Sequence, residues 1–323
     1  MTTFLPGPVD VHAHWLPAEL FGLPPGAPYR PISDRDGQLF IGDIPLSIDS
    51  RLMSDVDAIR ADMEAAGIAV RVLSAPPFAF ARHDLPGANE YTEAFNTALS
   101  AVVRDSHGAF AGFGSVNLGN VDASARQIET LRDDDGIVGI AIPPIVGDES
   151  LDVGALRDIL RLAARADLAV LVHPMQLPAP AMGRHYLTNL IGNPTESAVA
   201  VASTLLGGVM EELPELRICF VHGGGCAPDL LGRWDHAWHA RPDVSAGSRT
   251  PPSEGFRQLY FDTVTHDELA LALLSEKAGD ARILIGSDYP FDMADNDPLN
   301  NAIGRGLTTH DLDRATRQFL RVE

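Results

Sequence analysis

The chain has 323 residues, of which 45% are hydrophobic and 21% are charged, so its composition is that of a folded globular protein and excludes a disordered or fibrous one. Its 24 basic and 44 acidic residues give a formal charge of −20, and a field of that sign repels phosphate backbones and anionic lipid surfaces. We therefore expect neither a nucleic-acid partner nor a membrane partner.

Short apolar runs that are typical of buried parallel strands recur along the whole chain. They cover residues 9–14, 69–75, 110–117, 137–143, 168–173, 217–222, 259–264 and 282–287. Segments with helical periodicity alternate with them, at residues 49–66, 88–104, 121–132, 151–166, 195–212, 228–240, 267–278 and 311–321. This alternation predicts a (β/α)8 barrel. Because no linker divides the chain, residues 1–323 are expected to form a single domain.

The alternation is interrupted once, by a segment rich in Pro and Gly over residues 16–50. Within it, Asp36 and Gly37 stand between two short strand-like pieces, which predicts a hairpin. Because this insertion follows the first strand, it is expected to lie at the catalytic face of the barrel, as a lid or rim of the active site.

The cellular location is suggested by two negative features. The first residues, MTTFLPGPVDVHAHW, lack the basic and apolar regions of a signal peptide, and no apolar run is long enough to span a bilayer. Cys219 and Cys226 are too few for a disulfide framework and lack the spacing of a metal or redox pair. A cytoplasmic protein with reduced thiols is expected.

Four polar residues stand at the carboxyl ends of predicted strands, namely His12, His14, His173 and Asp288. In a barrel these ends converge on one mouth, and His12 and His14, two residues apart on a strand, point to the same face. If the four residues were ordinary core residues, their polar groups would each be buried without a hydrogen-bond partner. Three imidazoles and one carboxylate predict a site for one divalent ion, with zinc as the first expectation and manganese as the alternative.

These residues lie within segments that resemble a known family. The resemblance is carried by VDVHAH at 9–14, LVHP at 171–174, FVHGGG at 220–225 and GSDYPF at 286–291. They resemble motifs of the amidohydrolase superfamily. Over almost its whole length, including IGNPTE at 191–196 and GGVME at 207–211, the chain is similar to the branch of 2-amino-3-carboxymuconate-6-semialdehyde decarboxylase and related nonoxidative decarboxylases.

The resemblance implies one metal ion held by the four strand-end residues, with His222 close by as the acid/base group. Binuclear relatives carry a carboxylated lysine at the end of strand four, where this chain reads IVGIAIPP. Lys277, the only lysine, lies in the helix before strand eight and cannot take that role. Histidine titrates near neutral pH, so His222 is expected to move a proton between metal-bound water and the substrate, and Asp288 to help shuttle it.

The reaction implied by the resemblance is loss of carbon dioxide from a small unsaturated or aromatic carboxylate. In the named decarboxylase, an arginine that follows the HGGG segment and comes from a neighbouring subunit binds a substrate carboxylate. That position matches Arg233, and a second arginine downstream matches Arg241. The active form is therefore expected to be a homodimer in which Arg233 reaches across the interface.

The substrate pocket departs from the family pattern. Ser47 occupies the place of a substrate-binding arginine after strand one, and Tyr186 and Asn189 occupy two aromatic positions after strand five. Such a pocket should not take the same ligand as the named decarboxylase. Phe78 and Phe291 are the remaining candidate pocket residues.

Two alternative functions stay open. The same metal centre would serve a hydrolase or hydratase that acts on an amide, a lactone or a ring-cleavage product, and that enzyme would incorporate oxygen from water. A barrel that has lost catalysis and acts as a scaffold would hold less than one metal ion per chain. Cys226 is interpreted as structural, because the nearby His222 is committed to the metal site.

Overall fold

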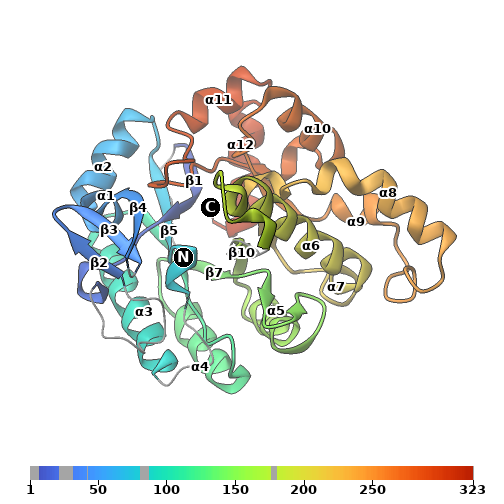
Figure 1. The fold of residues 1–323 in the computed structure, drawn as a ribbon, viewed down its shortest axis with the longest axis horizontal. Helices are drawn as coiled ribbons and strands as arrows, with labels where there is room; N and C mark the ends of the chain where they lie inside the picture. Colours follow the sequence, from blue (N-terminus) through green and yellow to red (C-terminus); the bar gives the residue numbers. More distant parts are fainter. Residues whose placement is uncertain (1–6, 22–31, 42, 81–86, 176–179, 323) are drawn as a thin grey trace.

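The computed structural model describes residues 7–21, 32–41, 43–80, 87–175 and 180–322. Its centre is a ring of parallel strands in the order β1, β5, β6, β7, β10, β11, β12 and β13 (Figure 1). They cover Val9–His14, Val70–Ser74, Phe110–Gly114, Ile137–Ile142, Ala169–Val172, Ile218–Phe220, Tyr260–Asp262 and Ile283–Leu284. The order in space is the order in the chain, which confirms the predicted (β/α)8 barrel.

Hydrogen bonds between β1 and the segment that follows β13 complete the ring. The Val11 amide donates to the Ile285 carbonyl at 2.9 Å, and the His14 amide donates to the Tyr289 carbonyl at 2.7 Å. Ring closure pairs the edge strands with each other. It also places the first and last strands of the sequence side by side, which is what brings β1 next to Asp288.

Helices surround the ring and follow one another around it in chain order (Figure 1). The longer ones are α2 (Val56–Ala65), α3 (Ala88–Asp105), α4 (Val121–Arg132), α5 (Gly154–Ala166), α6 (Asn193–Leu206), α8 (Ala227–Ala240), α10 (Glu268–Ala278) and α12 (Thr309–Leu320). The shorter ones are α1 (Ser50–Ser54), α7 (Val209–Glu212), α9 (Pro252–Phe256) and α11 (Pro298–Gly304). Across the described part of the chain, no helix combines the length and apolarity needed to traverse a lipid bilayer.

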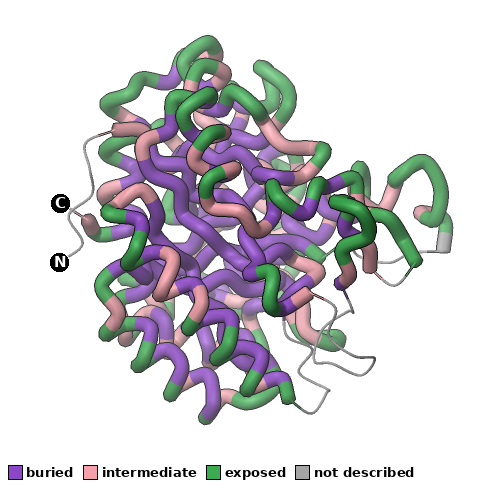
Figure 2. Tube along the Cα trace, turned by 90° about the vertical axis from the view of Figure 1, so that its left-hand side faces the viewer, coloured by how far each residue is buried: buried purple, intermediate pink, exposed green. Residues whose placement is uncertain are grey.

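The hydrophobic core lies between the ring and the helices, and Figure 2 shows buried residues through the centre of the molecule. Every residue of β1, β5 and β7 is buried, as expected for strands covered on both faces. In α5, Leu156, Ile159, Leu160 and Ala163 are buried at the i, i+3, i+4, i+7 spacing of one helix face. The sequence periodicity therefore identified both kinds of element.

Two predicted helices are interrupted in the structure. The helix predicted over 49–66 divides at Asp55, which is extended and accepts a hydrogen bond from the Asp57 amide as the N-cap of α2. The helix predicted over 195–212 divides before Gly208, which has φ +68° and lies so close to the Gly247 carbonyl that a Cβ would stand 2.3 Å from it. Both predictions of one continuous helix were wrong, because hydrophobic periodicity persists across a local break.

The insertion after β1 contains the predicted hairpin. Strands β2 (Ile32–Arg35) and β3 (Gln38–Ile41) pair antiparallel, and Asp36 and Gly37 form the turn with positive φ. A further strand, β4 (Ile44–Asp49), and a short hairpin of β8 (Ile145–Val146) and β9 (Glu149–Ser150) were not predicted. Residues 22–31 and 42 of the insertion lie outside the described residues, and its role as a lid stays a prediction.

Residues 227–256, which comprise α8, α9 and their connection, extend away from the barrel, and we call them the arm (Figure 1). Its base is held by Glu211, whose Oε1 accepts hydrogen bonds from the Ser248 hydroxyl at 2.9 Å and the Thr250 amide at 2.8 Å. Apolar side chains hold it as well: Leu231 and Phe256 are buried, and the Phe256 ring stacks on that of Phe261 in β12 with 4.5 Å between the centroids. The base of the arm is thus attached to the barrel by both polar contacts and apolar packing.

Candidate metal centre

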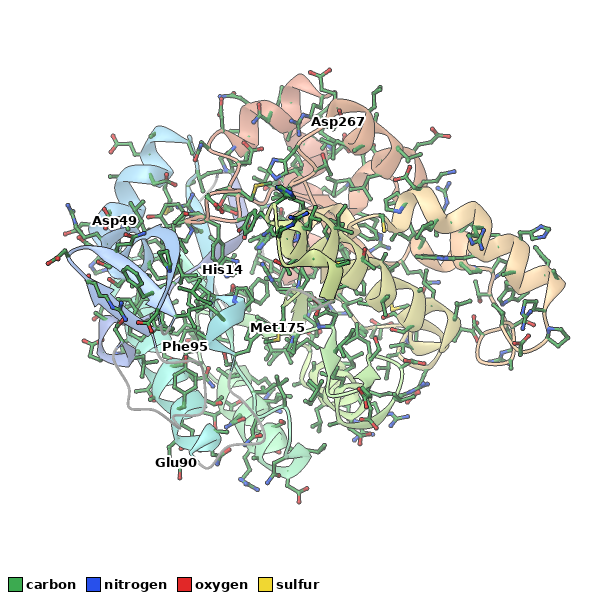
Figure 3. All side chains as sticks on the ribbon, viewed as in Figure 1. His14, Asp49, Glu90, Phe95, Met175 and Asp267 are labelled. Atoms are coloured by element: carbon green, nitrogen blue, oxygen red, sulfur yellow. The ribbon has the colours of Figure 1, made fainter. Side chains whose placement is uncertain are left out.

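Four side chains converge at the carboxyl-terminal mouth of the barrel. His12 and His14 come from β1, His173 follows β10 and Asp288 follows β13. One ligand atom of each residue lies within 4.8 Å of those of the other three, and all four residues are buried. Figure 3 shows His14 near the centre of the molecule. The structure therefore brings together the four residues that the sequence motifs indicated.

Each imidazole is held through the ring nitrogen that faces away from the cluster. His12 Nδ1 lies 2.6 Å from Asp262 Oδ2, and His173 Nδ1 lies 2.8 Å from the Pro174 carbonyl. His14 Nδ1 lies 3.2 Å from the Ser74 hydroxyl. Hydrogen bonds of this kind fix the ring orientation and leave Nε2 of each histidine as the free ligand atom.

Asp288 connects the three imidazoles. Its Oδ1 is 3.1 Å from His14 Nε2, 3.2 Å from His12 Nε2 and 3.7 Å from His173 Nε2. Two ligands of a tetrahedral ion with bonds of about 2.0–2.1 Å stand roughly 3.3 Å apart. The Nε2 atoms of His12 and His173 are buried and make no hydrogen bond with good geometry. Both observations fit a divalent ion at this position.

The protein groups set the charges of the cluster. Burial lowers the pKa of His14 and lowers the pKa of His173 to about 3, so both imidazoles are neutral. Burial would lower the pKa of His12 as well, but Asp288 and Asp262 outweigh it and raise this pKa to about 10. Burial would raise the pKa of Asp288, yet its histidine neighbours hold that pKa well below its usual value. The carboxylates of Asp288 and Asp262 thus favour a positive charge in the space between them, where His12 lies.

A second buried network supports the chain on both sides of Asp288. Asp10 accepts hydrogen bonds from the Ser287 hydroxyl at 2.6 Å and the Ser287 amide at 3.0 Å, and it pairs with Arg71 Nε at 2.9 Å. The Arg71 guanidinium lies over the Tyr289 ring, 4.4 Å from its centroid. The residues before and after Asp288 are therefore both fixed to the β1–β5 side of the barrel.

His222 lies beside the four converging groups. Its Nε2 is 3.3 Å from Asp288 Oδ2, and its ring centroid is 5.1 Å from that of His173 and 5.3 Å from that of His12. Its Nδ1 is buried and has no hydrogen-bond partner among the described residues. This position next to a carboxylate suits the expected acid/base role, which stays a prediction.

The glycine run after His222 makes a tight turn that packs onto α6. His222 itself has φ +56°, and Gly225 has φ +64° with its Cα so close to the Pro194 carbonyl that a Cβ would stand 2.1 Å away. The Cys226 amide donates to the same carbonyl at 3.3 Å. Partial burial raises the pKa of the Cys226 thiol, which agrees with a structural rather than nucleophilic interpretation.

A cavity of about 310 Å³ opens beside the cluster. His222 and Asp288 form part of its wall, and Asn189 and Asn193 form another part. Its volume is at the lower end of the range for small-molecule pockets, so it suits a ligand of about one ring. Asn189 is the one predicted substrate residue that lines it.

The predicted aromatic residues lie next to the metal ligands. The Phe291 ring centroid is 5.0 Å from that of His14, and the Phe78 ring centroid is 6.1 Å from that of Phe291. Tyr186 is half-exposed, and its hydroxyl donates to Asp292 Oδ1 at 3.3 Å. These three side chains form the surroundings of the site, but they do not line the cavity of the described chain.

The predicted polar substrate residues lie farther out. Ser47 is exposed on β4, and Arg233 is exposed on α8. Arg241 ends α8 and pairs with Asp243 at 2.7 Å, also in an exposed position. Within the described chain, none of the three lines the cavity. Their roles stay predictions.

The structure adds residues that the sequence interpretation did not single out. Asp262 is fully buried behind His12, while Asn193, Asp229 and His266 line the cavity. Asp262 lies inside the predicted strand 259–264, so the rule that pointed to residues at strand ends did not mark it, whereas in the structure β12 ends at this residue. His266 has φ +56° and follows the same strand, but nothing in its sequence context marks it.

Comparisons with known proteins identify the family of the chain. The family model described as amidohydrolase matches residues 9–320. A 2-amino-3-carboxymuconate-6-semialdehyde decarboxylase from Dictyostelium discoideum is 29% identical over 297 residues, which cover 89% of this chain and 82% of that protein.

Solved structures show the same fold. The structure of an apo-form protein named IDCase from Metarhizium anisopliae superimposes with a TM-score of 0.83 at 20% identity, covering 98% of this chain and 97% of the other. A 5-carboxyvanillate decarboxylase from Novosphingobium aromaticivorans, solved with manganese and 4-hydroxy-3-methoxy-5-nitrobenzoic acid, has a TM-score of 0.75 at 20% identity, with coverages of 84% and 82%.

Proposed function

This chain belongs to the amidohydrolase family, and from that premise we propose that it is a metal-dependent decarboxylase of a small aromatic or unsaturated carboxylate. One observation carries the proposal: Asp288 touches both the three converging imidazoles and His222, at the wall of one cavity. A metal site and a proton-carrying group therefore face the same small volume. The decarboxylases among the relatives support the choice of reaction.

The residues that would hold the metal are His12, His14, His173 and Asp288. The imidazole-rich set favours zinc, and the manganese in a structure of the same fold makes manganese the second candidate. When bound, such an ion acts as a Lewis acid on substrate oxygens and lowers the pKa of a coordinated water molecule. Neutral His14 and His173 and ionised Asp288 already have the protonation states that metal binding requires, whereas His12, with its pKa raised to about 10, would lose a proton when the ion binds.

His222 supplies the proton. We assign it to protonate the carbon that bears the carboxylate, after which the bond between this carbon and the carboxylate breaks. The electron pair of that bond stays with the ring or the unsaturated system, and carbon dioxide leaves. Asp288 Oδ2, 3.3 Å from His222 Nε2, orients the imidazole.

The second part of the site is proposed to come from another copy of the chain. Arg233 is exposed on the arm, away from the cavity of its own chain. Around the mouth, Met175, Leu190 and Ile191 expose 39%, 46% and 50% of their surface. A homodimer would cover such side chains and bring Arg233 to the carboxylate of a substrate bound in the partner, with Arg241 beside it.

The insertion over residues 16–50 is proposed to form a rim of the mouth. It begins directly after β1, which carries His12 and His14. The Leu16 amide donates to the Met53 carbonyl at 3.1 Å, so the two ends of the insertion are tied together beside these ligands. Ser47 would face the substrate only if the rim closes over the cavity.

A panel of aromatic and unsaturated carboxylates, assayed for carbon dioxide release with zinc-loaded and manganese-loaded protein, tests the function. We expect release from at least one single-ring carboxylate, without incorporation of oxygen from ¹⁸O-labelled water. Labelled product would identify a hydrolase or hydratase instead. A chain that binds less than one metal ion after loading, and is not activated by either metal, would be a non-catalytic barrel.

A further inference from the structure

Asp262 is a fully buried carboxylate at the end of β12 whose two oxygens have different tasks. Oδ2 lies 2.6 Å from His12 Nδ1. Oδ1 accepts hydrogen bonds from the Gly223 amide at 2.9 Å and the Val264 amide at 3.2 Å. One side chain therefore contacts a metal-ligand histidine and also the turn that follows His222.

The contact with His12 determines which ring nitrogen is free. A carboxylate next to Nδ1 holds the proton of the neutral ring on that nitrogen, so Nε2 is the atom with the lone pair that a metal ion needs, on the side of His14 and Asp288. The short distance and the complete burial of both groups restrict rotation of the ring. Asp262 thus prepares His12 as a ligand without touching the ion site itself.

The contact with Gly223 restrains a backbone that would otherwise be unfavourable. His222 has φ +56°, a conformation that residues with a Cβ adopt at a cost of about 1 kcal/mol or more. Gly223 follows with φ +60°, and a Cβ there would stand 2.7 Å from Thr265 Cγ2. The bond from the Gly223 amide to Asp262 fixes this turn to β12 and with it the position of the His222 ring.

We infer that Asp262 is a positioning residue that couples the metal site to the proposed acid/base group through its two oxygens. The inference rests on the proposed roles of the metal ligands and of His222. Because the carboxylate is shared, loosening it should weaken metal binding and release the His222 turn at the same time.

The test uses Asp262→Asn with Ser74→Ala as the matched control. A carboxamide is neutral and has one oxygen, so one partner faces its NH2 group and the other keeps only a neutral acceptor, whose hydrogen bond is about half as strong; both contacts are therefore weakened. Ser74 is equally buried and also lies behind a ligand histidine, His14, but it does not contact the His222 turn. Both variants should therefore weaken metal binding, but only Asp262→Asn should also loosen the His222 turn.

We expect Asp262→Asn to raise the dissociation constant for Zn²⁺ by about 10- to 100-fold, measured by competition with a chelator. In the zinc-loaded protein, hydrogen exchange of the Gly223 amide should become about 10-fold faster or more. Ser74→Ala should weaken zinc binding less and leave Gly223 exchange unchanged. Unchanged Gly223 exchange in Asp262→Asn, or zinc affinity within about twofold of the unmodified chain, would overturn the inference.

A measurement on the unmodified protein covers the case in which the variant does not fold. In zinc-loaded protein with ¹⁵N-labelled histidine, His12 should carry its proton on Nδ1, with the proton resonance shifted far downfield by the carboxylate. A His12 ring with an unprotonated Nδ1 would overturn the inference. If these results are as expected but no carboxylate releases carbon dioxide, the positioning role stands and the proposed function fails.

Discussion

The mouth of the barrel and the arm both carry residues assigned to the reaction, but the two regions hold them very differently. At the mouth, His12, Asp262 and Asp10 are fully buried, and each has a fixed partner on another strand of the ring. On the arm, Arg233 is exposed, and Arg241 pairs with a residue two positions away. The metal ligands therefore meet within one chain, whereas the role proposed for the arm requires a second copy.

This difference follows from the fold. Strand ends are fixed by ring closure and by the surrounding core, so side chains there keep their separation to within a fraction of an ångström. The arm extends from one side of the barrel, and its base is held by Glu211 and by buried apolar residues such as Phe256. Replacements at the mouth should consequently affect rate or stability strongly, and replacements on the arm should affect substrate binding or local stability more modestly.

The largest effect is expected at His222. We expect His222→Asn to keep its metal, because none of the four converging ligand atoms is removed, and to lose turnover by about 10²- to 10⁴-fold. Carbon dioxide release and metal content per chain measure the two effects. His310→Asn, an exposed histidine at the opposite end of the barrel, is the control. If His222→Asn kept its turnover, His222 would not be the acid/base group.

The second effect concerns the buried support of the mouth. Arg71 pairs with Asp10 at 2.9 Å and with Asp62 at 2.8 Å, and it is itself fully buried. Arg71→Ala would leave Asp10 buried and unpaired, so the free energy of unfolding should fall by about 3–5 kcal/mol in urea titrations. Arg35→Ala, which breaks an exposed pair with Asp43, should cost less than about 1 kcal/mol. Equal losses would show that burial at the mouth is not the deciding factor.

The third effect tests whether the arm completes the site of a partner. Arg233→Ala should raise KM by about 10- to 100-fold with a smaller change in kcat, because a charge-assisted contact to the substrate carboxylate is lost. Arg257→Ala, at an exposed arginine directly after the arm, should leave KM unchanged.

A mixing experiment tells whether Arg233 binds the substrate in the site of a partner chain or in the site of its own chain. Hybrids of Arg233→Ala and His222→Asn chains should regain activity, because one of their two sites has both residues intact. Absence of recovery in hybrids shown to form would contradict a shared site. An unchanged KM in Arg233→Ala would show that Arg233 is an exposed cation without a role in substrate binding.

The smallest effect is expected at the base of the arm. Partial burial would raise the pKa of Glu211, but hydrogen bonds from Ser248, Thr250 and Arg249 outweigh it and lower the pKa to about 2 from an ordinary 4.5. The carboxylate therefore contributes stability above about pH 4.5, and this contribution is lost as the pH falls toward 2. Glu211→Gln should cost about 1 kcal/mol at neutral pH.

The same pH range gives the check on Glu211. Urea titrations of the unmodified chain and of Glu211→Gln should converge between about pH 4.5 and pH 2, and Glu254→Gln, an exposed change on α9, should show no such convergence. A difference that stays constant down to pH 2 would mean that the charge of Glu211 is not what holds the arm.

Much of the fold and of the metal site could be predicted from local patterns. Continuous apolar runs identified the strands of the ring, and the HxH pair, His173 and Asp288 stood at strand ends that a barrel must bring together. Asp262 lay inside the predicted strand 259–264, and a single carboxylate within an apolar run carries no signal of its partner. Its role follows from contacts with His12 and Gly223, which are remote from it in the chain.

The sequence by itself determined the alternation of strands and helices, the hairpin at Asp36–Gly37 and the identity of the converging ligands, because these depend on periodicity, turn preference and the fixed direction of parallel strands. Only the tertiary structure decided where helices break, how β1 closes onto the segment after β13, and which buried carboxylates orient the ligands. Those outcomes depend on the packing of distant segments, such as Gly208 against Gly247 and Asp10 against Ser287, and no local window of sequence contains both partners.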